Sequence, residues 1–239
     1  MKMNKNSNTY QIVYSAILVI IVGTVLAFIY MQLKPLQDEN RDNDTRKQIL
    51  AAIKVYPEND EAIVADYNRY IVNEYLVNEK GAVVDSSEHV AFNVNMAKNV
   101  KQTKRALPLL VALVKGEKKY IIPVYGAGLW GPIWGYVAMN ADGKTIFGTN
   151  FSHQGETPGL GAKITEKEFT EKFEGKHIYM EGAFKSVEVV KKGQKSVSGA
   201  ESIDAISGAT ITSRGVSAML SDCLQPYDAF FKTLQAVNP

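Results

Sequence analysis

The sequence contains few of the residues that build metal sites and disulfide frameworks. Its 239 residues include one cysteine and only three histidines, His89, His153 and His177, which lie far apart along the chain. A single cysteine excludes a disulfide framework and any zinc or iron–sulfur site built on several cysteines. The scattered histidines offer no local metal-ligand spacing. We therefore expect no metal site in this protein.

An excess of charge of one sign is also missing. The 27 lysines and arginines nearly balance the 25 acidic residues, and no basic stripe alternates with aromatic residues. This balance excludes the electrostatic footprint of a protein that binds nucleic acid. Hydrophobic residues make up 46% of the chain and charged residues 22%, which excludes a wholly disordered protein. The length suits one membrane element followed by one domain with a hydrophobic core.

One long hydrophobic run predicts a membrane-spanning helix. Residues 12–31 contain no charged side chain, and twenty helical residues span about 30 Å, the thickness of a bilayer's hydrocarbon core. Lys2 and Lys5 precede the run, whereas several acidic residues follow it. The positive-inside rule then predicts a cytoplasmic segment at 1–9, a transmembrane helix at 10–32 and an extracytoplasmic remainder. A cleaved signal peptide is the alternative, but the run is long for one and no small-residue cleavage site follows.

The rest of the chain predicts a stalk and a single α+β domain. Residues 33–43 are polar, contain one proline and are interpreted as the stalk, so the domain occupies 44–239. The domain's strands and helices do not alternate strictly, which predicts a largely antiparallel sheet flanked by helices. Strands are expected from Glu74 and at 82–85, 107–114, 120–125, 132–139, 145–152 and 184–190, and helices from Asn43 or Asp44 to 55, from 60, at 165–173 and from 212.

A glycine pattern at residues 126–131 formally matches G-x-G-x-x-G, the fingerprint of dinucleotide-binding domains. That fingerprint requires a helix to begin directly after it, so that the helix N-terminus can meet a pyrophosphate. Here Pro132 and the residues after it predict a strand, and no acidic residue lies near the expected offset. We interpret the glycines as a structural turn.

Two other stretches are candidates for ligand chemistry. Residues 153–161 (HQGETPGLG) form a loop with three glycines, and glycine lets a backbone approach a flat ligand closely. By composition alone, a plain connection is the more common meaning of such a loop. Residues 204–213 (DAISGATITS) gather hydroxyl and carboxylate side chains at the start of a helix, where free N–H groups favour a phosphate. The alternative, which the residues alone favour, is N-capping by Ser207, Thr212 or Ser213.

The two stretches together resemble a known family. D-x-x-S-G-A-T at 204–210 matches the recognition sequence of the flavin transferases, which esterify the phosphate of FMN onto a threonine hydroxyl. With H-x-x-E-T-P-G-L-G at 153–161 and one N-terminal span, the chain resembles the C-subunit family of the sodium-translocating NADH:quinone oxidoreductases. The G-L-W segment at 128–130 also resembles this family. The G subunits of the ferredoxin-linked Rnf complexes share the two flavin motifs, lack that segment and are the alternative.

The resemblance implies an FMN-binding domain in which FMN is covalently bound. It assigns residues to three tasks: attachment of the phosphate, contact with the phosphate oxygens, and contact with the isoalloxazine ring. The implied residues are Thr210 for attachment, with Ser207, Gly208 and Ala209 as a close turn around the ester, Thr212 and Ser213 as donors to the phosphate, Glu156, Thr157, Gly159 and Leu160 along the ring, and Lys163 near enough to stabilise a reduced, anionic flavin.

The resemblance further implies a membrane-anchored electron carrier within a sodium-pumping complex. The chain itself shows no NADH site, so its FMN is expected to pass electrons between neighbouring subunits. The implied partners are the other subunits of the complex, a flavin transferase during maturation and the lipid bilayer. The implied location is a bacterial inner membrane, with the FMN domain on the periplasmic side. A non-redox tethered scaffold and a free-standing extracytoplasmic flavin reductase are the alternatives from other functional classes.

Three further residues are assigned to packing. Trp130 and Trp134 lie next to the glycine pattern and are expected to pack in the core or an interface, since that is the commoner role of tryptophan at the start of a strand. Cys223 falls within the apolar stripe of the last helix and is expected to be a buried thiol.

Overall fold

The computed structural model describes residues 8–237, and the chain divides into two compact units, Met1–Thr45 and Arg46–Pro239. Helix α1 (Asn8–Ala52) supplies the described part of the first unit and continues into the second. It is the one helix among residues 8–237 that is long and apolar enough to cross a membrane. Its apolar side chains, Ile20 and Phe28 among them, are exposed, as the lipid-facing surface of an anchor requires.

The segment between the apolar run and the domain is helical. We expected residues 33–43 to form a stalk separate from the next helix, but α1 continues through them without a break. Asn43 and Asp44 are therefore not helix caps, and that prediction is wrong. Pro35 lies inside the helix, where it removes one backbone hydrogen bond. Ion pairs on the same segment favour the helix, since Asp38 Oδ1 lies 2.9 Å from Lys34 Nζ at i,i+4 spacing.

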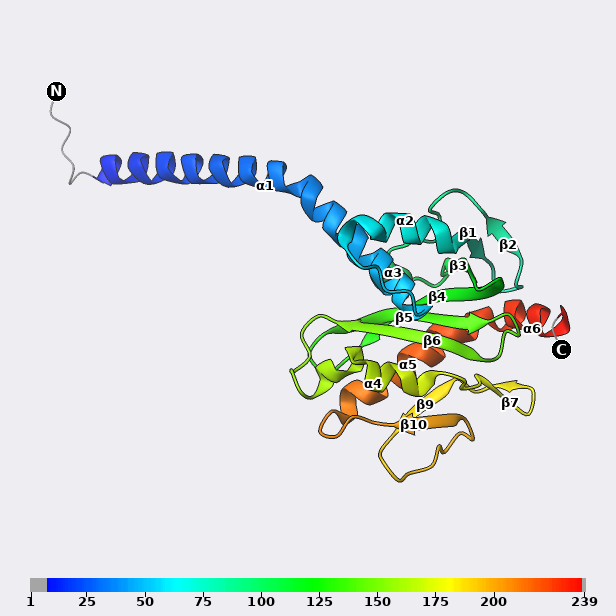
Figure 1. The fold of residues 1–239 in the computed structure, drawn as a ribbon. Coiled ribbons are helices and arrows are strands. Elements are labelled where there is room, and N and C mark those ends of the chain that lie inside the picture. The colour runs from blue at the N-terminus through cyan, green and yellow to red at the C-terminus, as the bar shows by residue number, and fades with distance from the viewer. Residues whose placement is uncertain (1–7, 238–239) are drawn as a thin grey trace. The chain divides into compact units, whose positions relative to one another are not determined.

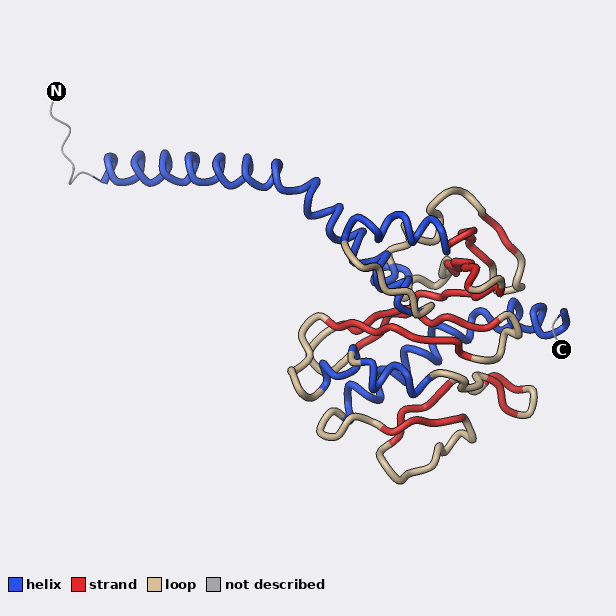
Figure 2. Tube along the Cα trace, viewed as in Figure 1, coloured by secondary structure: helices blue, strands red, loops and turns tan. Residues whose placement is uncertain are grey.

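The second unit is built on a six-stranded sheet with the strand order β2-β1-β3-β4-β5-β6 (Figures 1 and 2). Every neighbouring pair in the sheet is antiparallel. The sheet therefore confirms the predicted architecture, and each strand expected between residues 107 and 152 is present. The strands are β1 (Ile71–Val77), β2 (Val83–Asp85), β3 (Leu107–Val114), β4 (Glu117–Ala127), β5 (Pro132–Asn140) and β6 (Ile146–His153).

Helices cover both faces of the sheet because successive strand residues point to opposite sides. On one face, Leu109 and Ile122 join a core with residues of α5 (Thr210–Leu224) and α6 (Asp228–Val237). On the other face, their neighbours Leu110 and Ile121 pack with the last turns of α1 and with α2 (Asp60–Tyr70). Figure 1 shows α5 alongside the sheet, between it and strands β9 and β10.

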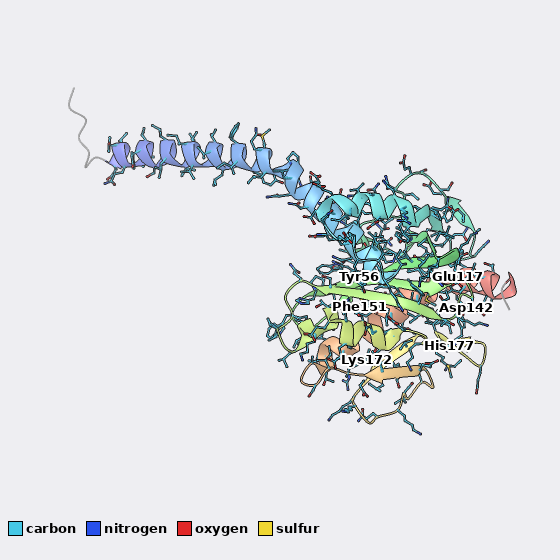
Figure 3. All side chains as sticks on the ribbon, viewed as in Figure 1. Tyr56, Glu117, Asp142, Phe151, Lys172 and His177 are labelled. Carbon is cyan, nitrogen blue, oxygen red and sulfur yellow. The ribbon has the colours of Figure 1, made fainter. Side chains whose placement is uncertain are left out.

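The smaller elements of the second unit differ from several predictions. The strand expected at 184–190 is interrupted at Ser186, whose φ of 59° is incompatible with an extended chain. The helix expected at 165–173 is divided into short turns, which Phe169 and Phe173 hold against Phe151 (labelled in Figure 3). These elements are α3 (Met96–Asn99), η1 (Gly161–Thr165), α4 (Lys167–Thr170), η2 (Glu171–Phe173), the antiparallel pair β7 (Tyr179–Met180) and β8 (Ala183–Phe184), the parallel pair β9 (Val187–Val190) and β10 (Glu201–Asp204), and η3 (Gln225–Tyr227).

Candidate functional site

A buried carboxylate joins the three segments that carry the sequence motifs. Glu156, in the 153–161 loop, is only 4% exposed. Its Oε1 accepts a hydrogen bond of 2.8 Å from the backbone N–H of Trp130, in the turn between β4 and β5. Its Oε2 accepts one of 2.5 Å from the hydroxyl of Thr212, in the first turn of α5. We call Glu156, Trp130 and Thr212 the Glu156 clip.

Two glycines make room for the clip. A Cβ atom added to Gly128 would collide with Glu156 Oε1, and one added to Gly161 would collide with Oε2. The Gly128 N–H also donates to the carbonyl of Gly131 over 2.8 Å and closes the turn, from which β5 continues directly. The glycine pattern is therefore a structural turn, as predicted, and its glycines allow close packing.

The surroundings of the clip keep its carboxylate ionised. Burial favours the neutral acid, but the hydrogen bonds from the Thr212 hydroxyl and from the N–H groups of Trp130 and Leu129 outweigh that effect. Together with the nearby His153, they hold the pKa of Glu156 below its ordinary value. Since a hydroxyl has one proton to donate, that of Thr212 is used by the carboxylate.

Thr212 and Ser213 do not lie where the resemblance placed them. Both are buried, at 1% and 0% exposure, and the Ser213 hydroxyl accepts the N–H of Ile206 over 3.2 Å. Their expected role as hydrogen-bond donors to a phosphate is therefore wrong, because the side chains point into the protein. The capping alternative is wrong as well. The N-cap of α5 is Ala209, and no side chain caps the helix.

Thr210 lies on the surface, next in the chain to the exposed apolar Ile211. It is the first residue of α5 and is exposed, as is the preceding Ser207. A Cβ on Gly208 would lie 2.9 Å from Leu160 Cδ2, so the 207–209 turn touches the 153–161 loop. Four large apolar side chains of these segments are exposed: Leu129, Trp130, Leu160 and Ile211. Apolar side chains exposed on segments that contact one another fit a flat aromatic ligand.

The other predicted ring contacts divide into two groups. Thr157, Gly159 and Leu160 are exposed on the loop. Glu156 is buried, and its carboxylate accepts hydrogen bonds from Trp130 and Thr212. Lys163, in η1, lines a cavity of about 230 Å³ together with Asp204 and Ser207. The structure thus brings Lys163 to the segment that precedes Thr210.

The two tryptophans differ from each other. Trp134 is half-buried and its Nε1–H donates to Gln48 Oε1 over 3.1 Å, which confirms the packing role predicted for it. Trp130 is 68% exposed, so it does not pack in the core, and its predicted role in an interface stays a prediction. Its backbone N–H is held by the Glu156 clip while its indole ring is left free at the surface.

A larger groove opens beside Thr210. It has a volume of about 950 Å³ and lies between α5 and the β9 segment, with Thr210 in its wall. Sequence reasoning missed Arg214, which lines the same groove one helical turn after Thr210. The signal was present in the four-residue spacing, since residues i and i+4 of a helix share a face.

Cys223 is a buried thiol, as predicted. Burial raises the pKa of this thiol to about 11, so it is not a reactive thiolate at neutral pH. No three His, Cys, Asp or Glu side chains within the described range, 8–237, are grouped so that they could hold a metal ion.

Comparisons with known proteins agree on one family. The model of the FMN-binding domain family matches residues 128–225, which include all the predicted site residues. The C subunit of the Na(+)-translocating NADH-quinone reductase of Haemophilus ducreyi is 29% identical over 99% of both chains. The C subunit of the same reductase from Chlamydia trachomatis is 27% identical over 94% of this chain and 92% of its own. A crystal structure of the C subunit from Parabacteroides distasonis is 47% identical, with a TM-score of 0.77, and the match covers 83% of this chain and 96% of that one.

Proposed function

Because the chain belongs to the C-subunit family of the Na(+)-translocating NADH-quinone reductases, we propose that Thr210 is the residue to which its FMN is covalently attached. The protein is an FMN-carrying electron-transfer subunit of that oxidoreductase complex, so it works together with other subunits. The Rnf-type subunit, the non-redox scaffold and the free-standing reductase are not supported, since the matched relatives named above are all C subunits of this reductase.

The position of Thr210 carries this proposal. Of the four hydroxyl groups between residues 204 and 213, those of Thr212 and Ser213 are buried, and those of Ser207 and Thr210 are exposed. Only Thr210 combines exposure with the first position of an uncapped helix of 15 residues. The partial positive charge at such a terminus stabilises the single negative charge that a phosphodiester retains.

Attachment needs an activated donor and an accessible hydroxyl. Direct esterification would release water and is unfavourable in water, so we assign a phosphoanhydride of FMN as the donor and a flavin transferase as the catalyst. The Oγ–P bond forms at Thr210 as the anhydride P–O bond breaks, and the hydroxyl proton leaves with the departing phosphate group. Gly208, with φ of 76°, and the small Ala209 leave the approach to Thr210 open.

The neighbouring segments supply the contacts for the ring. FMN, when bound, accepts and passes on electrons. Thr157, Gly159 and Leu160 are the exposed loop residues next to the 207–209 turn, and we assign them to the ring surface. Lys163 is assigned as the nearby positive charge. The buried Glu156 supports these contacts from below by holding the loop to α5.

The apolar part of α1 is assigned to the lipid bilayer. The helix is a single exposed apolar rod in the described residues, which fits a membrane-anchored protein. The basic residues before the apolar run favour a cytoplasmic N-terminus in a bacterial inner membrane, with the FMN domain on the periplasmic side. Protease protection of the domain in intact inverted membrane vesicles tests this orientation.

The attachment is tested on the full-length chain, purified in detergent after co-expression with a flavin transferase. Wild-type protein should give a fluorescent band after denaturing electrophoresis and a peptide around residue 210 that is heavier by FMN minus water. Thr210→Ala should abolish both signals while leaving the fold intact, because the side chain is exposed and does not cap α5.

Two further variants control the result. Ser207→Ala removes the other exposed hydroxyl and should stay fluorescent, and Thr210→Ser should retain some attachment because it keeps a hydroxyl. An unmodified wild-type peptide, or fluorescence that survives in Thr210→Ala, would refute the assignment.

A further inference from the structure

We propose that Arg214 binds the phosphate group through which FMN is joined to Thr210. This inference rests on the attachment proposed above and deepens it, because it names the charged partner of the ester. The resemblance implied that Thr212 and Ser213 contact the phosphate, but both hydroxyls point into the protein. Besides the helix N-terminus, the exposed side of α5 offers that charge a side chain that the resemblance did not name.

Thr210 and Arg214 lie on one stripe of α5 that faces the 950 Å³ groove. The stripe is spaced by three or four residues, as expected for one face of a helix. The opposite wall of the groove is formed by β9 and the residues on either side of it. The residues of the stripe are Thr210, Arg214, Ser217, Ala218 and Ser221, and Gln225 at the start of η3 continues it.

The direction of helical side chains brings the guanidinium group to Thr210. Cβ atoms four residues apart on a helix are separated by about 5–6 Å, and each Cα–Cβ bond tilts toward the helix N-terminus. The long side chain of Arg214 therefore extends back over the turn that begins with Thr210. A phosphate on the Thr210 oxygen lies within reach of the guanidinium donors.

The charges around the groove make Arg214 available to a phosphate. The Arg214 side chain is exposed, and none of the ion pairs within residues 8–237 includes it. Glu188 is the carboxylate among the described residues that line the groove, whereas Lys185, Lys191 and Lys195 also line it. The groove is thus basic. A guanidinium group is a permanent cation, and its fork of N–H donors matches two oxygens of a phosphate.

The test compares three variants of the full-length protein, flavinylated by co-expression and purified in a phosphorus-free detergent. Arg214→Gln removes the charge and Arg214→Lys keeps the charge without the fork. Lys191→Gln is the matched control, because it removes one positive charge from the other side of the same groove. The ³¹P NMR resonance of the phosphodiester reports directly on the contact, and the fluorescence anisotropy of the tethered flavin reports on its mobility.

We expect Arg214→Gln to shift the ³¹P resonance and to lower the flavin anisotropy relative to wild type. Lys191→Gln should leave both unchanged, and Arg214→Lys should fall between Arg214→Gln and wild type. Circular dichroism of each variant checks that the domain remains folded. If Arg214 had only a structural role, its replacement would change the circular dichroism, and any protein that stayed folded would keep the wild-type ³¹P resonance.

The outcomes separate this inference from the proposed function. Wild-type protein without flavin on Thr210 would refute the attachment itself. Flavinylated Arg214→Gln with a wild-type ³¹P resonance would overturn the role of Arg214 alone. Folded Arg214→Gln and Arg214→Lys that both fail to receive flavin would also overturn it, because the transferase would then be the partner that recognises this residue.

Discussion

Replacing Glu156 with glutamine tests whether the Glu156 clip holds the site together. The substitution keeps the size of the side chain and removes its negative charge. The single oxygen of the amide can still accept the Trp130 N–H, but the amide nitrogen is a donor and cannot accept the Thr212 hydroxyl. The change therefore affects the link between the 153–161 loop and α5 more than the packing around it.

The expected cost follows from the hydrogen bonds that are lost or weakened. A hydrogen bond to a charged group contributes about 1.5–3 kcal/mol, compared with about 0.5–1.5 kcal/mol for a neutral one. The carboxylate accepts one from the Thr212 hydroxyl and others from the N–H groups of Trp130 and Leu129. We expect Glu156→Gln to lower the free energy of unfolding by about 2–3 kcal/mol. Glu156→Ala, which also leaves a cavity, should cost about 3–5 kcal/mol.

The effect should depend on pH. The folded-state pKa of Glu156 is lower than the ordinary value of 4.5, so the carboxylate contributes stability above the unfolded-state pKa. This contribution is lost as the pH falls through the folded-state pKa. The difference in stability between wild type and Glu156→Gln should therefore be constant near neutral pH and should shrink as the pH falls below about 4.5.

Two measurements on the full-length chain in detergent check this prediction. Urea unfolding gives the free energy difference, and hydrogen exchange of the Trp130 amide reports on the clip itself. Glu171→Gln is the control, because Glu171 is an exposed acid of the same domain. If Glu156→Gln unfolded at the wild-type urea concentration and kept its Trp130 amide protected at neutral pH, the clip would not be a stabilising contact.

Three other substitutions test the packing around the site, each by urea unfolding. Gly215→Ala would drive a Cβ into the carbonyl oxygen of Ala127, where α5 crosses the end of β4, and should lower stability by about 1–2 kcal/mol despite the better helix propensity of alanine. Gly155→Ala, whose Cβ would meet no atom within 4 Å, should change stability by less than about 0.5 kcal/mol. Ser186→Gly should raise stability by about 1 kcal/mol, because it relieves a φ of 59° and removes a buried hydroxyl that has no hydrogen-bond partner in the described part of the chain. An unchanged Gly215→Ala, or a destabilised Ser186→Gly, would contradict the respective argument.

The central sheet could be predicted because its signals are local. The strands between residues 107 and 152 are apolar runs separated by glycine-containing turns, and they pair with their neighbours in sequence. β10 could not be predicted in this way, since it pairs in parallel with β9 across an irregular loop. The prediction of a separate stalk gave Pro35 too much weight, because one proline is tolerated where the ion pairs of Asp38 with Lys34 and Arg41 favour the helix.

The site was only partly predictable for a similar reason. The motifs identified Thr210 and the 153–161 loop, but the Glu156 clip joins residues that are 56 positions apart, and no spacing in the sequence announces that contact. The exposure of Trp130 was also not predictable, because Glu156 accepts a hydrogen bond from its backbone N–H and not from its indole ring.

The phase of α5 connects the correction at Thr212 with the proposal at Arg214. The buried apolar stripe of α5 includes Val216, Leu220 and Cys223, and counting back by three or four residues places positions 212 and 213 on the same buried face. The face opposite then contains 210 and 214. The buried hydroxyls of Thr212 and Ser213 therefore hold α5 to the rest of the domain, whereas the hydroxyl of Thr210 is exposed to a ligand. Arg214 lies on the same face as Thr210 and carries a positive charge. The sequence shows this periodicity, but the helix was predicted to begin at residue 212 and begins at Thr210, two residues earlier.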